Sequence, residues 1–392
     1  VIYYSTFFIF AYIFIGEVYM LLSKKLKWIF LISFSFLLVL VGFFSFERLS
    51  AIPVSSSQAF EWHNSTSENT VQEKKYIKWF EFKVSYDVLD KTSKLDIQSH
   101  TKNEDVKLNW IELIAYLACK YGNDFSRYKY QDLTNLVEKL RSGQTMADLT
   151  KDMKNYNYYF EGYDSVLHEF IGEFKKEVKT NTTKNNQVAN NTIVEQEIPQ
   201  KQFEDTYGIK AFHPVAKNYS YSHYDDFGAS RSYGYKRLHF GNDLMGSIGA
   251  PIIAVESGVV EAAGWNQYGG WRIGIRSFDK KRYYYYAHLR KNHPYAENLK
   301  EGQIVQAGDV IGYLGMTGYS TKENVNNINV PHLHFGIQLI FHEVQKEGPN
   351  QIWVDLYELV NFLQKNRSEV YKSNQETKDY SRKYEIIDPI VP

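Results

Sequence analysis

The strongest constraint on this chain is a long stretch without charge, residues 28–46 (WIFLISFSFLLVLVGFFSF). A helix over this stretch would span about 28 Å, at about 1.5 Å per residue, which is close to the thickness of the hydrocarbon core of a bilayer. Lys24, Lys25 and Lys27 precede it, and positive charge favours the cytoplasmic side. We therefore expect a membrane anchor with the rest of the chain on the extracytoplasmic side. Because no small-residue cleavage site follows closely, the pattern favours an uncleaved anchor over a cleaved signal peptide.

Residues 1–19 leave two alternatives open. They are apolar enough to form a second span, interrupted by Glu17, which would make a helical hairpin with residues 28–46. Alternatively, the protein starts at Met20, where a methionine, three lysines and the apolar run follow in the usual order. Both alternatives leave the remaining chain outside the cytoplasm. We assign residues 1–47 to the membrane segment.

The composition excludes several classes of protein. Lys and Arg together number 45, as do Asp and Glu, so the formal net charge is zero and no basic face for nucleic acid is expected. The single cysteine, Cys119, excludes an intrachain disulfide framework and a zinc site built from several cysteines.

The composition then changes several times along the chain, and these changes suggest a series of domains. A Ser-, Asn- and Thr-rich linker (48–72) precedes a region of helical periodicity, which we predict to be a domain of helices over 73–178. Its apolar residues recur at helical spacing within 108–121, and further helices are expected over 131–140, 145–153 and 166–174. No residue in this domain indicates a reaction, so we interpret it as a spacer or as a module that binds envelope proteins. A second linker is expected over 179–202, where apolar periodicity is absent.

From residue 203 onward, short β-type segments alternate with glycines. This pattern predicts a mostly-β domain of short strands over 203–366, which ends in an amphipathic helix over 353–364. Residues 367–392 form a polar tail that we expect to be poorly ordered.

Five residues of the β-rich region have the chemistry of a metal site. His239 and Asp243 lie four residues apart in HFGND, while His332 and His334 lie two apart in PHLHF and so point to the same face of a strand. His288 ends another strand-like segment, YYYYAHL. Each motif alone is weak, but their combination in one domain favours a metal site. Three nitrogen or oxygen ligands with an open fourth position are typical of catalytic zinc.

Several motifs of this region, taken in order, resemble those of a known family. They are DFGASR (226–231), HFGND, GSIGAPIIAVESGVVEAAG, YYAHL, VQAGDVIGYLGMTGYST and PHLHF. Together they are similar to the motifs of the lysostaphin/LytM-type zinc metallopeptidases. These are peptidoglycan endopeptidases with the duplicated hybrid motif fold, which consists of antiparallel β-sheets of short strands. The resemblance covers about a third of the chain.

The resemblance implies a role for each of the five residues. His239, Asp243 and His334 would bind Zn²⁺, and His288 and His332 would be the catalytic histidines that do not bind the metal. How these two would divide proton transfer and oxyanion stabilisation stays open. Tyr284 and Tyr286 would lie on the same face of the strand as His288, where a hydroxyl could reach the oxyanion or simply pack on the sheet.

The chain departs from the family pattern in two main places. A polar insertion, KENVNNINV (322–330), separates the Thr321 segment from PHLHF, and Gly336 stands where the family usually has Glu. The resemblance implies a membrane-anchored zinc endopeptidase that hydrolyses peptide bonds of peptidoglycan. The alternative is a catalytically silent scaffold of the same fold that binds partners at the cell envelope, for example in sporulation. The complete set of five residues favours the enzyme.

Overall fold

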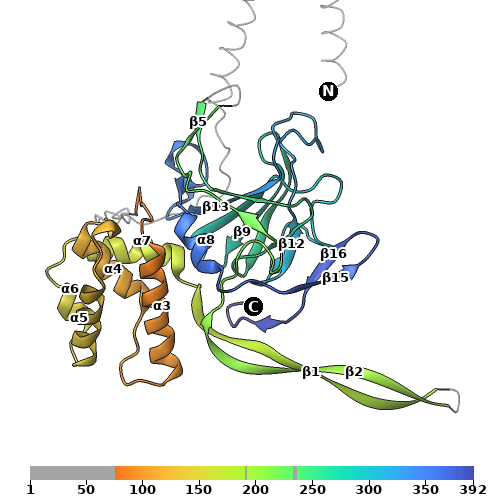
Figure 1. Ribbon diagram of the computed structural model, residues 1–392, viewed down its shortest axis with the longest axis horizontal. Coiled ribbons are helices and arrows are strands. Elements are labelled where there is room, and N and C mark those ends of the chain that lie inside the picture. Colours follow the sequence, from red (N-terminus) through yellow and green to blue (C-terminus); the bar gives the residue numbers. More distant parts are fainter. Residues whose placement is uncertain (1–75, 190–191, 233–235) are drawn as a thin grey trace, which may run out of the picture. The chain divides into compact units, whose positions relative to one another are not determined.

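The computed structural model describes residues 76–189, 192–232 and 236–392 (Figure 1). The expected anchor and the first linker, 1–72, lie outside the described residues. Among the helices that are described, none is both long enough and apolar enough to cross a bilayer. Residues 74–392 form one compact unit.

Helices make up the first part of this unit. They are α3 (Tyr86–Thr101), α4 (Trp110–Tyr121), the 3-10 turn η1 (Phe125–Arg127), α5 (Tyr130–Arg141), α6 (Met146–Thr150) and α7 (Tyr156–Leu167). In α4 the apolar residues bury one face, and the Asn109 side chain accepts hydrogen bonds from the first backbone N–H groups. The helix ends at Gly122, whose φ of 63° is the left-handed conformation that glycine adopts readily. The helices expected within 108–121, 131–140 and 145–153 are confirmed.

The chain departs from expectation after α7. The helix predicted over 166–174 is wrong, because α7 ends at Leu167 and β1 begins at Ile171. β1 (Ile171–Ala189) and β2 (Thr192–Ile209) pair as a long antiparallel hairpin, from Ile171 opposite Ile209 to Ala189 opposite Thr192. The described residues of the expected linker, 179–189 and 192–202, therefore lie in paired strands. Their backbone groups bond to each other across the hairpin, which requires no apolar periodicity in the sequence.

A large antiparallel sheet forms the centre of the β-rich part, as expected. Its strand order is β11-β8-β9-β10-β13-β6-β3, and β14 also pairs with β13. The bounds are β3 (Tyr221–Ser222), β6 (Asn242–Gly246), β8 (Gly258–Asn266), β9 (Gly270–Ser277), β10 (Arg282–Ala287), β11 (Ile304–Val305), β13 (His332–Leu339) and β14 (Ile352–Trp353). Smaller pairs are β4 (Ser230–Ser232) with β5 (Lys236–Leu238) and β7 (Pro251–Ile253) with β12 (Val310–Tyr313). The mostly-β, antiparallel fold class is thus confirmed.

The C-terminal residues are ordered rather than loose. They form the pair β15 (Val370–Asn374) with β16 (Asp379–Arg382), and β17 (Ile386–Ile387) adds to β1. The Arg367 guanidinium donates to the carbonyl oxygens of Val215, Ala216 and Tyr219, and buried Asp388 accepts a hydrogen bond from Lys210. The expectation of a poorly ordered tail is therefore wrong, since its charged groups are bonded to the body of the protein.

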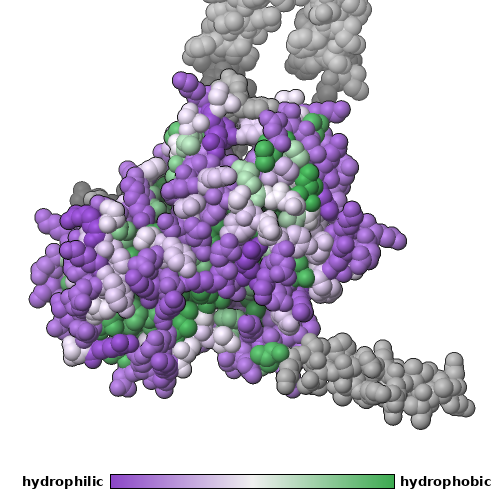
Figure 2. Space-filling view, viewed as in Figure 1, coloured by the Kyte–Doolittle hydropathy of each residue, from purple (hydrophilic) through white to green (hydrophobic). Residues whose placement is uncertain are grey.

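The helical part packs directly on the β-rich part. α8 (Tyr357–Leu363) carries Phe362, whose ring stacks on Trp110 with centroids 5.7 Å apart. The Arg282 guanidinium donates to the backbone oxygen of Ser165 at the end of α7 (3.0 Å). The face of the molecule that Figure 2 shows is mostly hydrophilic, with smaller apolar areas between the polar ones.

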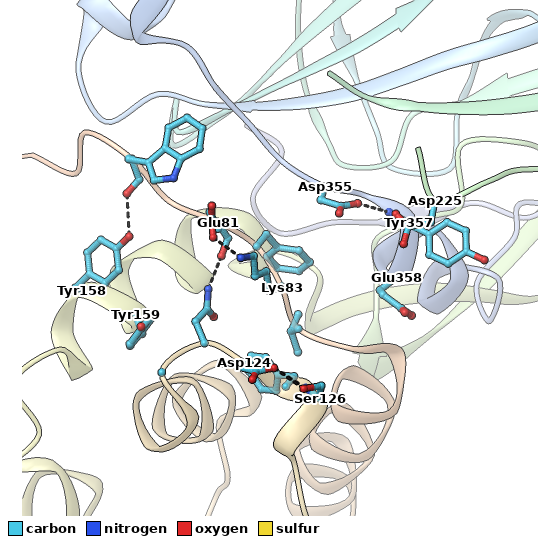
Figure 3. A pocket seen from close by; sticks show the side chains of 16 residues that line it. Glu81, Lys83, Asp124, Ser126, Tyr158, Tyr159, Asp225, Asp355, Tyr357 and Glu358 are labelled. Atoms are coloured by element: carbon cyan, nitrogen blue, oxygen red, sulfur yellow. Dashed lines mark hydrogen bonds and ion pairs between the residues drawn. The ribbon is translucent and has the colours of Figure 1, made fainter. Parts of the chain in front are cut away.

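A cavity of about 680 Å³ lies where the two parts meet (Figure 3). Carboxylates from both parts line it, Glu81 and Asp124 from the helical part and Asp355 and Glu358 from the region of α8. Burial raises the pKa of Asp355, and the nearby charges of Asp225 and Glu358 raise it further. Several of these acids already have partners within the protein, such as Lys83 for Glu81 (2.5 Å) and the backbone N–H of Tyr86 for Glu358 (3.1 Å).

Candidate metal centre

Strand pairing brings the expected site residues together. Asp243 on β6 lies directly opposite His334 on β13, and His334 lies opposite Ala287 on β10. His288, the first residue after β10, is therefore next to β13 as well. His332 lies two residues before His334 on the same strand and so faces the same side.

Three of the five residues converge on one point. His239 Nε2 lies 3.0 Å from Asp243 Oδ1 and 3.1 Å from His334 Nδ1, and His334 Nδ1 lies 2.9 Å from Asp243 Oδ1. Ligands about 2.0–2.1 Å from a tetrahedral zinc ion are themselves about 3.3 Å apart. Two imidazole nitrogens and one carboxylate oxygen at this spacing fit a zinc ion with an open fourth position.

The Asp243 carboxylate sets the charges at this point. Burial would raise the pKa of Asp243, but hydrogen bonds from His239 and His334 hold it far below its usual range. Burial also disfavours the charged form of His239, yet the Asp243 carboxylate outweighs this effect and raises the pKa of His239. The carboxylate is therefore ionised at neutral pH, as a metal ligand must be.

Residues outside the expected set hold His239 in place. The buried Asp226 Oδ1 lies 3.2 Å from His239 Nδ1, on the side of the ring away from Asp243. Arg231 on β4 pairs with Asp226, and its guanidinium lies 3.7 Å from Asp243 Oδ2. Such carboxylate–histidine pairs orient metal-binding histidines. Both residues belong to the DFGASR motif, for which the sequence suggested no role.

His288 and His332 have the same hydrogen-bonding arrangement. His288 Nδ1 lies 2.9 Å from the backbone oxygen of Thr317, and His332 Nδ1 lies 2.8 Å from that of Val330. A carbonyl only accepts, so each Nδ1 carries the hydrogen and each Nε2 keeps a lone pair in the neutral ring. Burial lowers the pKa of both rings, and neighbouring His332 and His334 reinforce this effect at His288. Both are thus neutral and able to accept a proton.

The backbone at His288 decides between the two alternatives for the tyrosines, and packing on the sheet is confirmed. The φ of His288 is 62°, so the backbone leaves the strand conformation there, and the alternation of β10 does not extend to it. Tyr284 and Tyr286 are fully buried, and their hydroxyls bond to Glu256 and to the backbone N–H of Val255. Both pack in the core. Tyr285, on the opposite face, has its ring 6.0 Å from that of His334.

A cavity of about 230 Å³ encloses the site, and all five expected residues line it. Part of the polar insertion, Asn327–Asn329, lines it too. Asn324 anchors the insertion, because its side-chain oxygen accepts from Trp271 Nε1 (3.0 Å) and from the backbone N–H of Asn292 (2.8 Å). The insertion is thus a wall of the cavity, beside the metal site.

Gly241 gives a direct test of how tightly the site is packed. A Cβ there would lie 2.6 Å from His334 Cε1, closer than nonbonded atoms approach. We expect Gly241→Ala to displace the His334 ring and weaken zinc binding by about 10- to 100-fold, comparable to losing a group that orients a ligand. The matched control is Gly264→Ala on β8, where a Cβ meets nothing within 4 Å. Competition with a zinc-binding dye measures both affinities, and equal affinities would show that the site tolerates the displacement.

Part of the chain is similar in sequence to known proteins. Residues 237–347 match the model of Peptidase family M23. The L-Ala–D-Glu endopeptidase of Bacillus subtilis (strain 168) is 41% identical over 124 residues, which are 32% of this chain and 36% of that protein. Lysostaphin of Staphylococcus simulans is 41% identical over 99 residues, or 25% of this chain and 17% of that protein.

Among solved structures, the catalytic domain of lysostaphin from Staphylococcus simulans is 34% identical and has a TM-score of 0.26, covering 33% of this chain and 84% of that one. The chain thus spans about a third or less of the length of these two curated relatives. The family resemblance of the sequence motifs is confirmed, since residues 237–347 match the model of Peptidase family M23.

Proposed function

We propose that the protein is a membrane-anchored zinc endopeptidase that hydrolyses peptide bonds of peptidoglycan. One observation carries the proposal. Three ligand atoms lie within 3.1 Å of one another, in a cavity that also holds two neutral histidines. A metal donor set beside free bases is the arrangement that metal-assisted hydrolysis requires.

His239, Asp243 and His334 would hold the zinc ion. A bound zinc ion would act as a Lewis acid. It would polarise a peptide carbonyl and lower the pKa of a water molecule at the site. The protein supplies the rest of the chemistry. Nε2 of His288 or of His332 takes the proton from the attacking water and can return it to the leaving amine. The backbone oxygens of Thr317 and Val330 keep these nitrogens in the form that accepts a proton.

The relatives support the proposed substrate, and the sequence supports the proposed location. One relative is named an L-Ala–D-Glu endopeptidase, and the motifs resemble those of peptidoglycan endopeptidases. The uncharged run at 28–46 would hold the domain at the outer face of the cell membrane, close to the wall. The helical part packs on the peptidase part and could present a surface to envelope proteins.

Metal removal tests the proposal as a whole. The protein incubated with purified peptidoglycan is expected to release soluble muropeptides with new amino termini. Chelation followed by dialysis should stop the release, and one equivalent of Zn²⁺ should restore it. Stoichiometric zinc without any released muropeptide would instead support the silent scaffold.

The two catalytic histidines provide a finer test. His288→Ala and His332→Ala are each expected to keep about one zinc per chain, because neither supplies a ligand atom, and to lose about 10²- to 10⁴-fold in rate. His168→Ala is the matched control, since His168 lies half-exposed after α7 and bonds to Asp164. Zinc content by mass spectrometry and the release of amino groups are the measurements. A variant with full activity would remove that histidine from the mechanism.

A further inference from the structure

Arg237 stands at the junction of two cavities. A groove of about 660 Å³ runs beside the metal cavity over the exposed face of the sheet. Arg237 and His334 line both of them. A peptide lying in the groove with its scissile bond at the metal would therefore pass the Arg237 side chain.

The charge of Arg237 is not neutralised within the described residues. In the pairing of β4 with β5, Arg231 lies directly opposite Arg237, and like charges in this position repel. Arg231 is compensated by Asp226 and Asp243. For Arg237, by contrast, the described ranges contain no carboxylate at ion-pair distance, and its Nε is buried without a hydrogen-bond partner.

The surroundings of Arg237 orient it and strengthen its field. Its guanidinium lies over the ring of Tyr319, 5.2 Å from the centroid, and Tyr319 in turn stacks on His288. Arg272 lines the same groove and adds a second positive charge to it. An oriented guanidinium with an unused buried N–H is a receptor for a planar anion, above all a carboxylate.

We propose that Arg237 binds a free carboxylate of the substrate peptide beside the scissile bond. The inference rests on the proposed peptidase function and narrows its substrate class. Peptides that carry such a carboxylate are stem peptides, in which glutamate linked through its γ-carboxyl keeps the α-carboxyl free. Bridges made only of glycine lack one. The enzyme is therefore specific for stem bonds next to an acidic residue.

A pair of synthetic stem peptides tests this specificity. The two are identical except that the α-carboxyl of the γ-linked D-glutamate is free in one and amidated in the other. The wild-type protein is expected to cleave the acid with a kcat/KM at least about 10-fold higher, because a charged hydrogen bond would be lost with the amide. Arg237→Gln should raise the KM for the acid peptide by about 10- to 100-fold, with kcat nearly unchanged. The kcat/KM for the amidated peptide should stay at the wild-type value.

Controls separate this role from a structural one. Lys236→Gln removes a positive charge one residue away, on the opposite face of β5, and should keep the preference for the acid. Arg237→Lys should keep part of it, since lysine retains the charge but loses the bidentate geometry. Equal rates on both peptides for the wild type, or an equal loss on both for Arg237→Gln, would overturn the proposal.

A binding measurement distinguishes failure of this inference from failure of the proposed function. If the zinc-loaded wild-type protein cleaves neither peptide, calorimetric titration with the same two peptides still measures the preference. Tighter binding of the acid that disappears in Arg237→Gln would support the carboxylate site without hydrolysis. Equal binding of both peptides by the wild type would refute it.

Discussion

Replacing Asp243 with alanine is expected to empty the metal site and to lower peptidoglycan hydrolysis by at least about 10³-fold, since a catalytic metal lowers the activation barrier by several kcal/mol. Asp243 is the only anion among the three converging ligand atoms, and Oδ1 is within 3.0 Å of both imidazole nitrogens. Without it two histidines remain, and the positive Arg231 would lie beside them uncompensated on that side. Zinc content after gel filtration and the rate of muropeptide release are the two measurements.

Asp225→Ala is the matched control for this variant. Asp225 is one residue from Asp226 in the sequence, but it lines the cavity between the helical and β-rich parts, away from the metal site (Figure 3). It should keep one zinc per chain and the wild-type rate. A full zinc load together with undiminished cleavage in Asp243→Ala would contradict both the assigned ligand and the proposed reaction.

The sequence predicted that the five site residues would gather because metal chemistry restricts both residue type and spacing, and the family resemblance implied which three of them would bind the metal. HFGND and PHLHF place ligands on neighbouring strands, and strand alternation alone aims two histidines at one face. The residues that support the cluster were harder to predict. Thr317 and Val330 act through backbone oxygens, which every residue possesses, so no side-chain signal marks them. The turn of the backbone at His288, with its φ of 62°, likewise depends on tertiary contacts.

The errors in fold prediction have a related cause. The hairpin of β1 and β2 is held by backbone pairing between polar segments, and pairing of this kind leaves no alternation of apolar residues to detect. The C-terminal segment was expected to be loose because it is polar, but Arg367 and Asp388 use that polarity to bond to distant parts of the chain. Hydrophobic periodicity, by contrast, predicted α4 and α5 well, since each of them buries one apolar face.

A second large effect is expected from Glu256→Ala, this time on stability. Glu256 is 3% exposed and accepts two hydrogen bonds from the fully buried Arg282, at 2.7 and 2.9 Å, and a third from Tyr284. Its removal leaves Asp279, 3.1 Å from Nη2, as the remaining carboxylate partner of a buried guanidinium at the start of β10, the strand that leads to His288. Breaking one side of a buried ion pair costs about 3–5 kcal/mol of unfolding free energy, or a fall in Tm on the order of 10 °C.

The matched control is Glu261→Ala, which removes an equally bidentate partner of an arginine in a wetter place. Arg276 holds Glu261 at 2.6 and 3.1 Å, but the Glu261 side chain is 39% exposed, so water can replace the lost carboxylate. We expect a loss of about 1 kcal/mol or less. Denaturant unfolding followed by tryptophan fluorescence compares the two variants. Equal losses of unfolding free energy in the two variants would mean that burial does not set the strength of these ion pairs. They would also mean that Arg282 does not anchor β10 against the helices.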